Sequence, residues 1–488
     1  MLFNSLQYLV FFPIVFILYW WLNNKSLKWQ NILLLVASYY FYSCWDWRFV
    51  FLLAFSTGLD YISGITIYEA NTKTKKKLWL YLSVGINLGF LGFFKYYNFF
   101  IESFMELLKN FNLQPHYSTL KIILPVGISF YTFHGLSYVF DIYNNKIKPS
   151  YNWVNYTLFV SFFPLLVAGP IERATHLLPQ IERQRKFNYL KAIDGLRQIL
   201  WGLFKKIVIA DNCAIYANQI FNNSNDYSGG NLVLGAVFFT FQIYGDFSGY
   251  SDIALGSARL LGIELLKNFS FPYFSRDIAE FWRRWHISLS SWFKDYLYIP
   301  LGGSKGGMLI KIRNTFIIFL VSGFWHGANW TFIVWGALNA AYFLPLLLTN
   351  SNRNNIEIVA YGKLLPSFKD FLQIIITFGL TVFAWIFFRA ASVGHAFQYI
   401  KDMLIGLTQK EAYVEMLNFL HWKINYVILL LLALFLIVEW LGREENYALE
   451  KLGFKWNRYV RWGFYAFLIF TLGMFMQTEE SPFIYFQF

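Results

Sequence analysis

The stretch SGFWHGANW, from Ser322 to Trp330, lies inside a segment that contains no Asp, Glu, Lys or Arg from Asn314 to Leu348. About 20 apolar residues are enough to cross a hydrocarbon core of roughly 30 Å. This segment is therefore long enough for two crossings, although its sequence does not show where they divide. At its centre stands one imidazole, His326. Ionisable groups are costly at that depth, so this histidine is either a packed core residue or a functional group.

The rest of the chain has the same apolar character. Its 488 residues are 57% hydrophobic, 22% aromatic and only 14% charged, whereas soluble domains are about 25% charged. We count about eleven stretches of spanning length and find no repeat or linker between parts. The sequence therefore predicts an all-α, polytopic transmembrane bundle formed by a single domain over residues 1–488. The clearest stretches run over residues 2–22, 32–44, 50–67, 78–94, 122–140, 153–170, 196–210, 232–244, 315–348, 371–388, 424–440 and 460–476.

The formal charge of +13 is concentrated in the loops between these stretches. Basic loops stay on the cytoplasmic side of a membrane, which predicts that these loops of a multi-pass protein face the cytoplasm. Nucleic-acid binding is the other explanation of a basic chain, but the charges form no dense tract. Three apolar stretches separate the basic loops at Lys77 and Arg173. Both loops can lie on the cytoplasmic side only if the chain crosses the membrane an even number of times between them, two or four. One of the three stretches is therefore expected to be re-entrant, with backbone broken at Pro125, Pro164 or Pro170 around a cavity.

Residues Arg276 to Pro300 predict a different kind of element. Apolar side chains recur in this segment every three to four residues, which predicts one amphipathic helix at the membrane interface. On such a helix His286 falls beside Trp282 and Leu289, on the apolar stripe, and points inward.

Other motifs that carry chemistry give weaker signals. No Gly-x-Ser-x-Gly elbow is present, and LGGSKGG (Leu301–Gly307) lacks the Lys-Ser/Thr ending of a phosphate-binding loop, which favours a turn. Asp246 and Asp252, in YGDFSGYSD, suggest a carboxylate pair or a metal site, but no third ligand follows, which favours a structural polar network. No set of His, Cys, Asp and Glu has metal-ligand spacing, and the two cysteines form no disulfide framework.

His326 has two explanations that the residues leave open. It is a core histidine with hydrogen bonds between helices, or it is a general base, because a buried neutral imidazole can accept a proton at physiological pH. Gly323 and Gly327 would let a substrate approach the ring, although glycines in membrane helices also allow close packing. The chemistry that remains is proton abstraction from a hydroxyl, with transfer of a group from an activated donor. Four histidines, His116, His176, His395 and His421, lie in or near polar loops and are expected to be solvated.

Several motifs together resemble the membrane-bound O-acyltransferase (MBOAT) family, in its bacterial AlgI, PatA and DltB-like branch. The segment WRRWHISLSSWFKDYLYIPLGG (282–303) is followed by GFWHGANW (323–330). Five more motifs along the chain are similar to that branch: LPVGISFYTFHGLSYVFDIY, FFPLLVAGPIERATHLLPQI, WGLFKKIVIADN, YGDFSGYSDIALG and SPFIYFQF.

The resemblance implies a ring of helices around a thinned centre with a tunnel. It assigns His326 as the catalytic histidine and His286 as a second one that orients or polarises from the cytoplasmic rim. His134 lies where relatives often carry Gln, so it is not assigned to the site. Candidate residues for substrate or donor binding are Arg283, Arg284, Lys305, Trp325 and Asn329. Motif positions expected to be structural are Asp246, Asp252, Trp285 and Asp295.

These assignments predict a multi-pass O-acyltransferase of the bacterial inner (plasma) membrane. It is expected to move an acyl group, most simply acetyl, from a cytoplasmic thioester to hydroxyls of an exported polysaccharide or cell-wall glycan. The expected donor is acetyl-CoA or an acyl carrier, with no permanently bound cofactor. Arg283, Arg284 and Lys305 would hold its anionic groups, although the same charges also satisfy the positive-inside rule. An extracytoplasmic SGNH-hydrolase-like partner is expected to complete the transfer. Alternatives are D-alanyl transfer to a teichoic acid-like polymer, a flippase for a lipid-linked saccharide, whose spans would carry several charged residues, and a scaffold.

Overall fold

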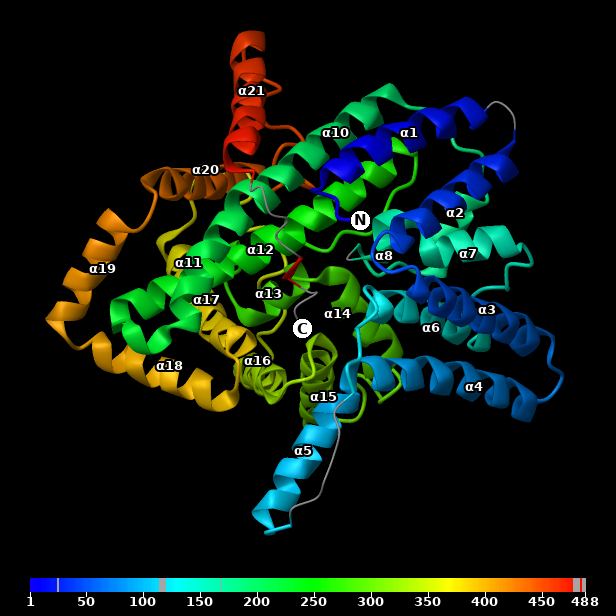
Figure 1. The fold of residues 1–488 in the computed structure, drawn as a ribbon, viewed down its shortest axis with the longest axis horizontal. Helices are drawn as coiled ribbons and strands as arrows, with labels where there is room; N and C mark the ends of the chain where they lie inside the picture. Colours follow the sequence, from blue (N-terminus) through cyan, green and yellow to red (C-terminus); the bar gives the residue numbers. More distant parts are fainter. Residues whose placement is uncertain (24–25, 114–119, 168, 477–482, 485–488) are drawn as a thin grey trace. The chain divides into compact units, whose positions relative to one another are not determined.

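The structure is a computed structural model of residues 1–488, in which all residues except 24–25, 114–119, 168, 477–482 and 485–488 are described. The described part is helical and contains no β-strand (Figure 1), which confirms the predicted all-α class. His116 and most of the SPFIYFQF motif lie outside the described residues. The chain divides into two compact units. Residues 1–192 with 258–266 form the first unit, and residues 193–257 with 267–488 form the second.

The first unit contains nine α-helices among its described residues. They are α1 (Leu6–Asn23), α2 (Leu27–Ser43), α3 (Arg48–Glu69), α4 (Lys73–Leu91), α5 (Tyr97–Asn110), α6 (Ile128–Tyr143), α7 (Trp153–Ser161), α8 (Phe163–Leu166) and α9 (Ala174–Ile181). A π-helical turn, η1 (Gly92–Tyr96), joins α4 to α5. Helices α3, α4 and α6 pack against one another, and α2 packs on α7 (Figure 1).

The expected broken backbone is present in this unit. Helix α6 begins only at Ile128, after a non-helical segment that contains Pro125, and α7 and α8 are separated at Phe162. Gly127 has a left-handed φ of 73°, and a Cβ there would lie 2.1 Å from the carbonyl oxygen of Leu166. Glycine is therefore required where the two broken segments meet.

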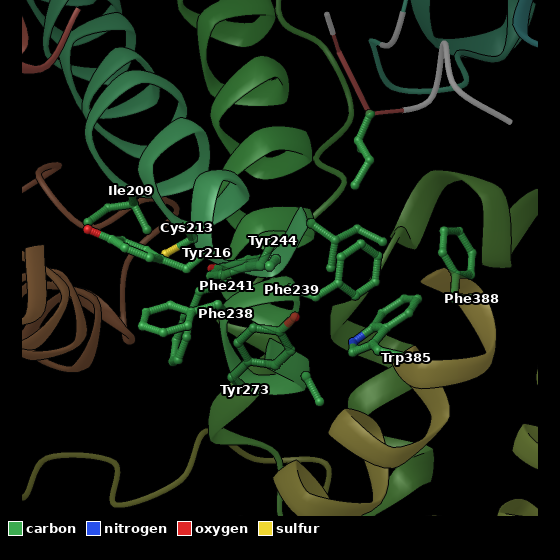
Figure 2. Close-up of a cluster of buried hydrophobic side chains, with 14 of the residues drawn as sticks. Ile209, Cys213, Tyr216, Phe238, Phe239, Phe241, Tyr244, Tyr273, Trp385 and Phe388 are labelled. Atoms are coloured by element: carbon green, nitrogen blue, oxygen red, sulfur yellow. The ribbon is translucent and has the colours of Figure 1, made fainter. Parts of the chain in front are cut away.

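The second unit begins within α10 and holds the longest helix. Its elements are α10 (Tyr189–Leu203), η2 (Phe204–Ala210), α11 (Asp211–Asn222), η3 (Ser224–Asp226), α12 (Gly229–Leu260), η4 (Pro272–Phe274), α13 (Ile278–Arg284), α14 (Ile287–Phe293), η5 (Lys294–Tyr298), α15 (Met308–His326), α16 (Trp330–Leu348), α17 (Phe368–Arg389), α18 (Val393–Gly406), α19 (Lys410–Trp422), α20 (Tyr426–Gly442) and α21 (Arg458–Phe475). Its core is rich in aromatic rings from α12 and α17, among them Tyr244, Trp385 and Phe388 (Figure 2).

Fewer helices qualify as spans than the sequence suggested. Among the described residues, seven helices are long and apolar enough to cross a membrane. The total is eight if α19 and α20, which are bent by 95°, count as one broken span. The predicted number of about eleven is not confirmed, because several apolar stretches form short or broken helices instead.

The uncharged segment around His326 is a helical hairpin. Helices α15 and α16 pack side by side and are joined at residues 327–329 (Figure 1), which supplies the division that the sequence did not show. A Cβ at Gly323 would lie 2.2 Å from the carbonyl oxygen of Phe332, and one at Gly336 would lie 2.3 Å from that of Phe319. At Gly327 a Cβ would lie 2.1 Å from the Phe332 ring. These glycines allow close helix packing, and the structure therefore supports that explanation over substrate access.

The segment from Arg276 to Pro300 is not the single helix predicted. It divides into α13, α14 and the π-helical turn η5, with Trp285 and His286 between the first two. His286 has a left-handed φ of 44°, a conformation that a side chain with a Cβ adopts only when its surroundings enforce it. The assignment of His286 to a continuous helical stripe is therefore wrong, although its side chain is fully buried, as expected.

Candidate active site

His326 is the last residue of α15, at the turn of the hairpin. Its side chain is buried, with 3% of its surface exposed. The ring lies 5.1 Å from that of Trp335 on α16 and 5.4 Å from that of Phe388 on α17, both edge to face. The neighbouring Trp325 ring is 5.0 Å away. The imidazole is thus enclosed by rings from three helices of the second unit, and Figure 2 shows Phe388 beside Trp385 on α17.

His286 is held in its strained conformation by the segment that precedes α13. The backbone N–H of Ile287 donates to the carbonyl of Asn268 at 2.8 Å, and the Ser288 hydroxyl donates to the Asn268 side chain. Asn268 in turn donates to the Ser251 hydroxyl of α12 at 3.2 Å. These hydrogen bonds fix the backbone on one side of His286 and offset the cost of the left-handed φ.

The two histidines are far apart in the sequence but lie close together in the second unit. Their ring centroids are 6.3 Å apart, and the Trp325 ring lies 6.0 Å from that of His286. Phe247 of α12 packs edge to face on His286 at 4.7 Å. Two buried imidazoles at this separation can act on one substrate, one accepting a proton and the other donating a hydrogen bond. His286, which the resemblance assigns to the cytoplasmic rim, thus has its ring beside that of His326.

Two of the candidate donor-binding residues, Arg283 and Arg284, have hydrogen-bond partners within the protein. Arg283 donates to the carbonyls of Asn352 and Asn355, at 2.9 Å and 2.7 Å. Arg284 donates to the Glu280 carboxylate at 2.8 Å and 3.0 Å. These guanidinium groups are engaged within the protein, and they do not line the pocket that contains Lys305.

Lys305 lies in a basic pocket of the second unit. The pocket has a volume of about 890 Å³ and is lined by residues of α14, η5, the glycine-rich turn, α15, α16 and the segment 350–353 that follows α16. Four cationic side chains contribute to it: Lys294, Lys305, Lys311 and Arg353. Ser290 also lines it, and the Ser290 N–H donates to the carbonyl of His286 at 3.0 Å. One wall of the pocket is therefore one helical turn from His286.

The remaining candidates have structural surroundings. Asn329 caps α16 by accepting from the N–H of Thr331 at 3.0 Å, and its amide donates to the carbonyl of Ala391 at 3.1 Å. Trp285 is fully buried and its ring lies 5.1 Å from that of Trp385. Asp295 is half-buried in η5. Of the candidates for substrate binding, Trp325 is therefore the one whose ring contacts both histidines.

Asp246 and Asp252 belong to a largely buried network of charges. Asp246 pairs with Lys206 at 2.7 Å and Asp252 with Lys205 at 2.6 Å. Nearby, Glu439 of α20 accepts from the Trp201 indole at 2.8 Å and from the Tyr244 hydroxyl at 2.6 Å. Paired charges are tolerated in an apolar interior because each partner neutralises the other.

This network corrects one expectation. Charged residues within the apolar stretches were expected of a flippase and not of this chain, but Lys205, Lys206 and Glu439 all lie inside such stretches and are buried. In the sequence, the pair Lys205–Lys206 interrupts the apolar stretch 196–210 and was the feature that could have indicated buried charges there. Among the residues that the structure describes, no group of three or more His, Cys, Asp or Glu side chains is arranged to hold a metal ion.

Sequence reasoning also missed the residues that enclose the histidines. Three of them are the aromatic residues Phe247, Trp335 and Phe388, and nothing in the sequence distinguishes them from the many other aromatic residues. The fourth is Asn268, which binds the backbone after His286. The four residues come from four different segments. Their role follows only from the folded positions of α12, α16 and α17.

Comparison with known proteins identifies the family. The family model for the membrane-bound O-acyltransferases matches residues 144–388, half of the chain, and this range includes both histidines. The chain is 38% identical to a protein of Pseudomonas aeruginosa named "Probable alginate O-acetylase AlgI", over 92% of this chain and 82% of that protein.

Two further relatives carry related names. A "Peptidoglycan O-acetyltransferase" of Helicobacter pylori is 36% identical over 83% of this chain and 80% of its own length. A "Teichoic acid D-alanyltransferase" of Bacillus subtilis is 28% identical over 58% of this chain and 73% of its own length. With a family model that covers half of the chain and relatives at this level of identity, the chain belongs to the membrane-bound O-acyltransferase family and is a multi-pass membrane O-acyltransferase.

Proposed function

We propose that the chain transfers an acetyl group from a cytoplasmic thioester donor to hydroxyls of an exported polysaccharide or cell-wall glycan. The observation that carries the proposal is the pair of buried imidazoles, 6.3 Å apart, inside the segment that matches the family. Acetyl is favoured over D-alanyl because the relatives at 36% and 38% identity are named for O-acetylation, whereas the relative named for D-alanylation is 28% identical.

In the proposed reaction His326 is the general base. Its neutral ring nitrogen takes the proton of the acceptor hydroxyl as the oxygen attacks the thioester carbonyl. The C–O bond forms, the C–S bond breaks, and the thiolate leaves and receives the proton from the imidazolium. His286 would donate a hydrogen bond to the carbonyl oxygen, where negative charge develops. The aromatic enclosure would exclude water, which otherwise competes with the acceptor for the thioester.

The basic pocket is the proposed entrance for the donor. Phosphate groups of acetyl-CoA or of an acyl carrier would lie against Lys294, Lys305, Lys311 and Arg353. A series of ring contacts leads from the pocket toward the histidines. The ring centroid of Phe319, in the pocket wall, lies 5.4 Å from that of Trp282. The Trp282 centroid lies 5.6 Å from that of Trp335, which in turn lies 5.1 Å from that of His326.

The location and the partner are parts of the same proposal. The basic loops support a plasma-membrane orientation with this pocket on the cytoplasmic side. If the transfer is relayed, the hydroxyl that His326 deprotonates would belong to an extracytoplasmic SGNH-hydrolase-like protein, which would then pass the acetyl group to the glycan. The family resemblance supports this partner, and acetylation by the chain with and without an added partner of that class would test it.

The decisive experiment compares glycan acetylation in cells that carry His326→Ala, His286→Ala or His421→Ala. We expect the first two substitutions to lower base-released acetate by about a hundredfold or more at equal protein level, because removal of a general acid or base costs about 10² to 10⁴ in rate. His421, an exposed residue of α19, is the matched control and should leave acetylation unchanged. Normal acetylation by His326→Ala would refute the enzyme mechanism and leave a scaffold role. Release of D-alanine instead of acetate would replace the acetyl proposal with D-alanyl transfer.

A further inference from the structure

Helix α12 carries an aspartate that binds a segment distant in the sequence. One carboxylate oxygen of Asp246 pairs with Lys206 at 2.7 Å, and the other accepts from the backbone N–H of Ile484 at 2.6 Å. Lys206 also pairs with Asp211 at 2.8 Å. The Asp246 side chain is 4% exposed, and Ile484 is 2% exposed. A charge-assisted hydrogen bond in such a buried place is stronger than one in water.

The adjacent residue of the bound segment packs on the same helix. Phe483 is fully buried, and its ring lies 4.7 Å from Tyr250 and 5.9 Å from Phe247. Phe247 follows Asp246 directly in α12, and Tyr250 lies one turn further on. One face of α12 thus holds the segment Phe483–Ile484 by a polar contact and by two ring contacts.

Phe247 connects this segment to the candidate active site. Its ring contacts Phe483 on one side and packs edge to face on His286 at 4.7 Å, with an interplanar angle of 85°. Asn268 fixes the backbone after His286 through Ile287, and the rings of Phe247 and Trp325 contact the imidazole itself. Closely packed rings transmit a displacement because they leave no free volume.

We propose that Asp246 and Phe483 are positioning residues for His286. The Asp246 carboxylate holds Ile484, and Phe483 keeps the Phe247 ring against the imidazole, so that it faces His326. The proposal rests on the proposed function, in which His286 takes part in acyl transfer. It adds that a segment more than 150 residues from the histidines in sequence completes the site.

The test uses the full chain in membrane vesicles and measures release of coenzyme A from acetyl-CoA in the presence of glycan acceptor. Phe483→Leu keeps an apolar side chain but removes the ring, and Asp246→Asn removes the charge at nearly constant size. We expect each to lower kcat by about tenfold or more, since small displacements of reacting groups cost up to about a hundredfold. KM for acetyl-CoA should stay within about twofold, because neither residue lines the basic pocket. The double variant should lose no more than the larger single effect, since both act on one contact.

Phe221→Leu is the matched control. Phe221 is a buried ring of the same unit that stacks on Tyr399 at 4.5 Å, so its loss removes similar apolar packing at another place. If Asp246→Asn fails to fold, Phe483→Leu alone decides. Wild-type kcat in Phe483→Leu, alongside an inactive His326→Ala, would overturn the positioning role and leave the proposed function intact. Equal release by wild type and His326→Ala would instead refute the proposed function, and the positioning role with it.

Discussion

At the scale of single residues, the surroundings of a histidine determine what its ring can do. His176, on α9 outside the candidate spans, has its Nδ1 2.8 Å from the Glu172 carboxylate. The hydrogen bond to this carboxylate, together with its charge, raises the pKa of His176 above its usual value near 6.5. The resulting stabilisation is complete below that value and is lost as the pH rises through the raised pKa. The sequence predicted a solvated ring in or near a polar loop, but His176 lies on α9 with its ring partly buried and paired with Glu172.

We accordingly expect His176→Ala to lower Tm more at pH 5.5 than at pH 8.5. The difference should be modest, about one or two degrees, because the side chain is partly exposed and solvent screens the pair. Thermal unfolding of the wild type and of His176→Ala in detergent, at both pH values, measures this difference in Tm. A Tm difference that is the same at both pH values would show that the pair contributes nothing through protonation.

The candidate residues differ in how well a sequence can identify them. His326 and His286 stand out because each is an imidazole in apolar surroundings, where an unused ionisable group is rare. Arg283 and Arg284 were equally visible, but their partners are backbone carbonyls near residue 355 and a carboxylate one turn away. Whether a cation binds a ligand or its own protein depends on the acceptors that folding brings to it.

At the scale of elements, the α15–α16 hairpin depends on glycine where the two helices touch. Gly323→Ala would place a Cβ 2.2 Å from the carbonyl oxygen of Phe332, which forces the helices apart. We expect a loss of about 1–3 kcal/mol in unfolding free energy, the range for overpacking a well-packed interior. Because His326 lies one turn further along α15, activity should fall as well.

Gly379→Ala on α17 is the control for this substitution. A Cβ at Gly379 meets nothing within 4 Å, so the change should be neutral or stabilising by up to about 1 kcal/mol through helix propensity. The Tm values of Gly323→Ala, Gly379→Ala and the wild type are compared in the same detergent. Equal stability of Gly323→Ala and wild type would mean that the helices can separate without loss.

Periodicity predicted the elements only where a helix is regular. It correctly indicated apolar helices on both sides of His326, but no signal in the uncharged segment marked the turn at residues 327–329. In Arg276–Pro300 the same periodicity wrongly joined α13 and α14. The break at His286 is stabilised by Asn268, which lies outside the segment, so a local pattern could not reveal it.

At the scale of the molecule, the basic pocket combines residues from six segments of the second unit. If it holds the donor, Lys305→Ala should raise KM for acetyl-CoA about two- to fivefold, the effect of losing one partly exposed ion pair. The increase should shrink at high salt, which screens exposed charges. Initial rates of coenzyme A release at two ionic strengths measure this change.

Lys369→Ala is the matched control, because Lys369 is an exposed lysine of α17 that does not line the pocket. Its KM should equal that of the wild type. If both substitutions raise KM alike, the effect comes from net charge and not from the pocket. If neither does, the donor binds elsewhere.

The sequence by itself determined that this is a helical membrane protein, that it is an O-acyltransferase by family, and that His326 and His286 are its leading candidates. It could do so because apolar length, charge placement and motifs are properties of the chain alone. Only the tertiary structure decided that the two rings lie 6.3 Å apart, that Lys305 rather than Arg283 lines the pocket, and that Phe483 contacts the ring beside His286. Those facts depend on contacts between residues far apart in the sequence, which arise from packing and leave no local pattern.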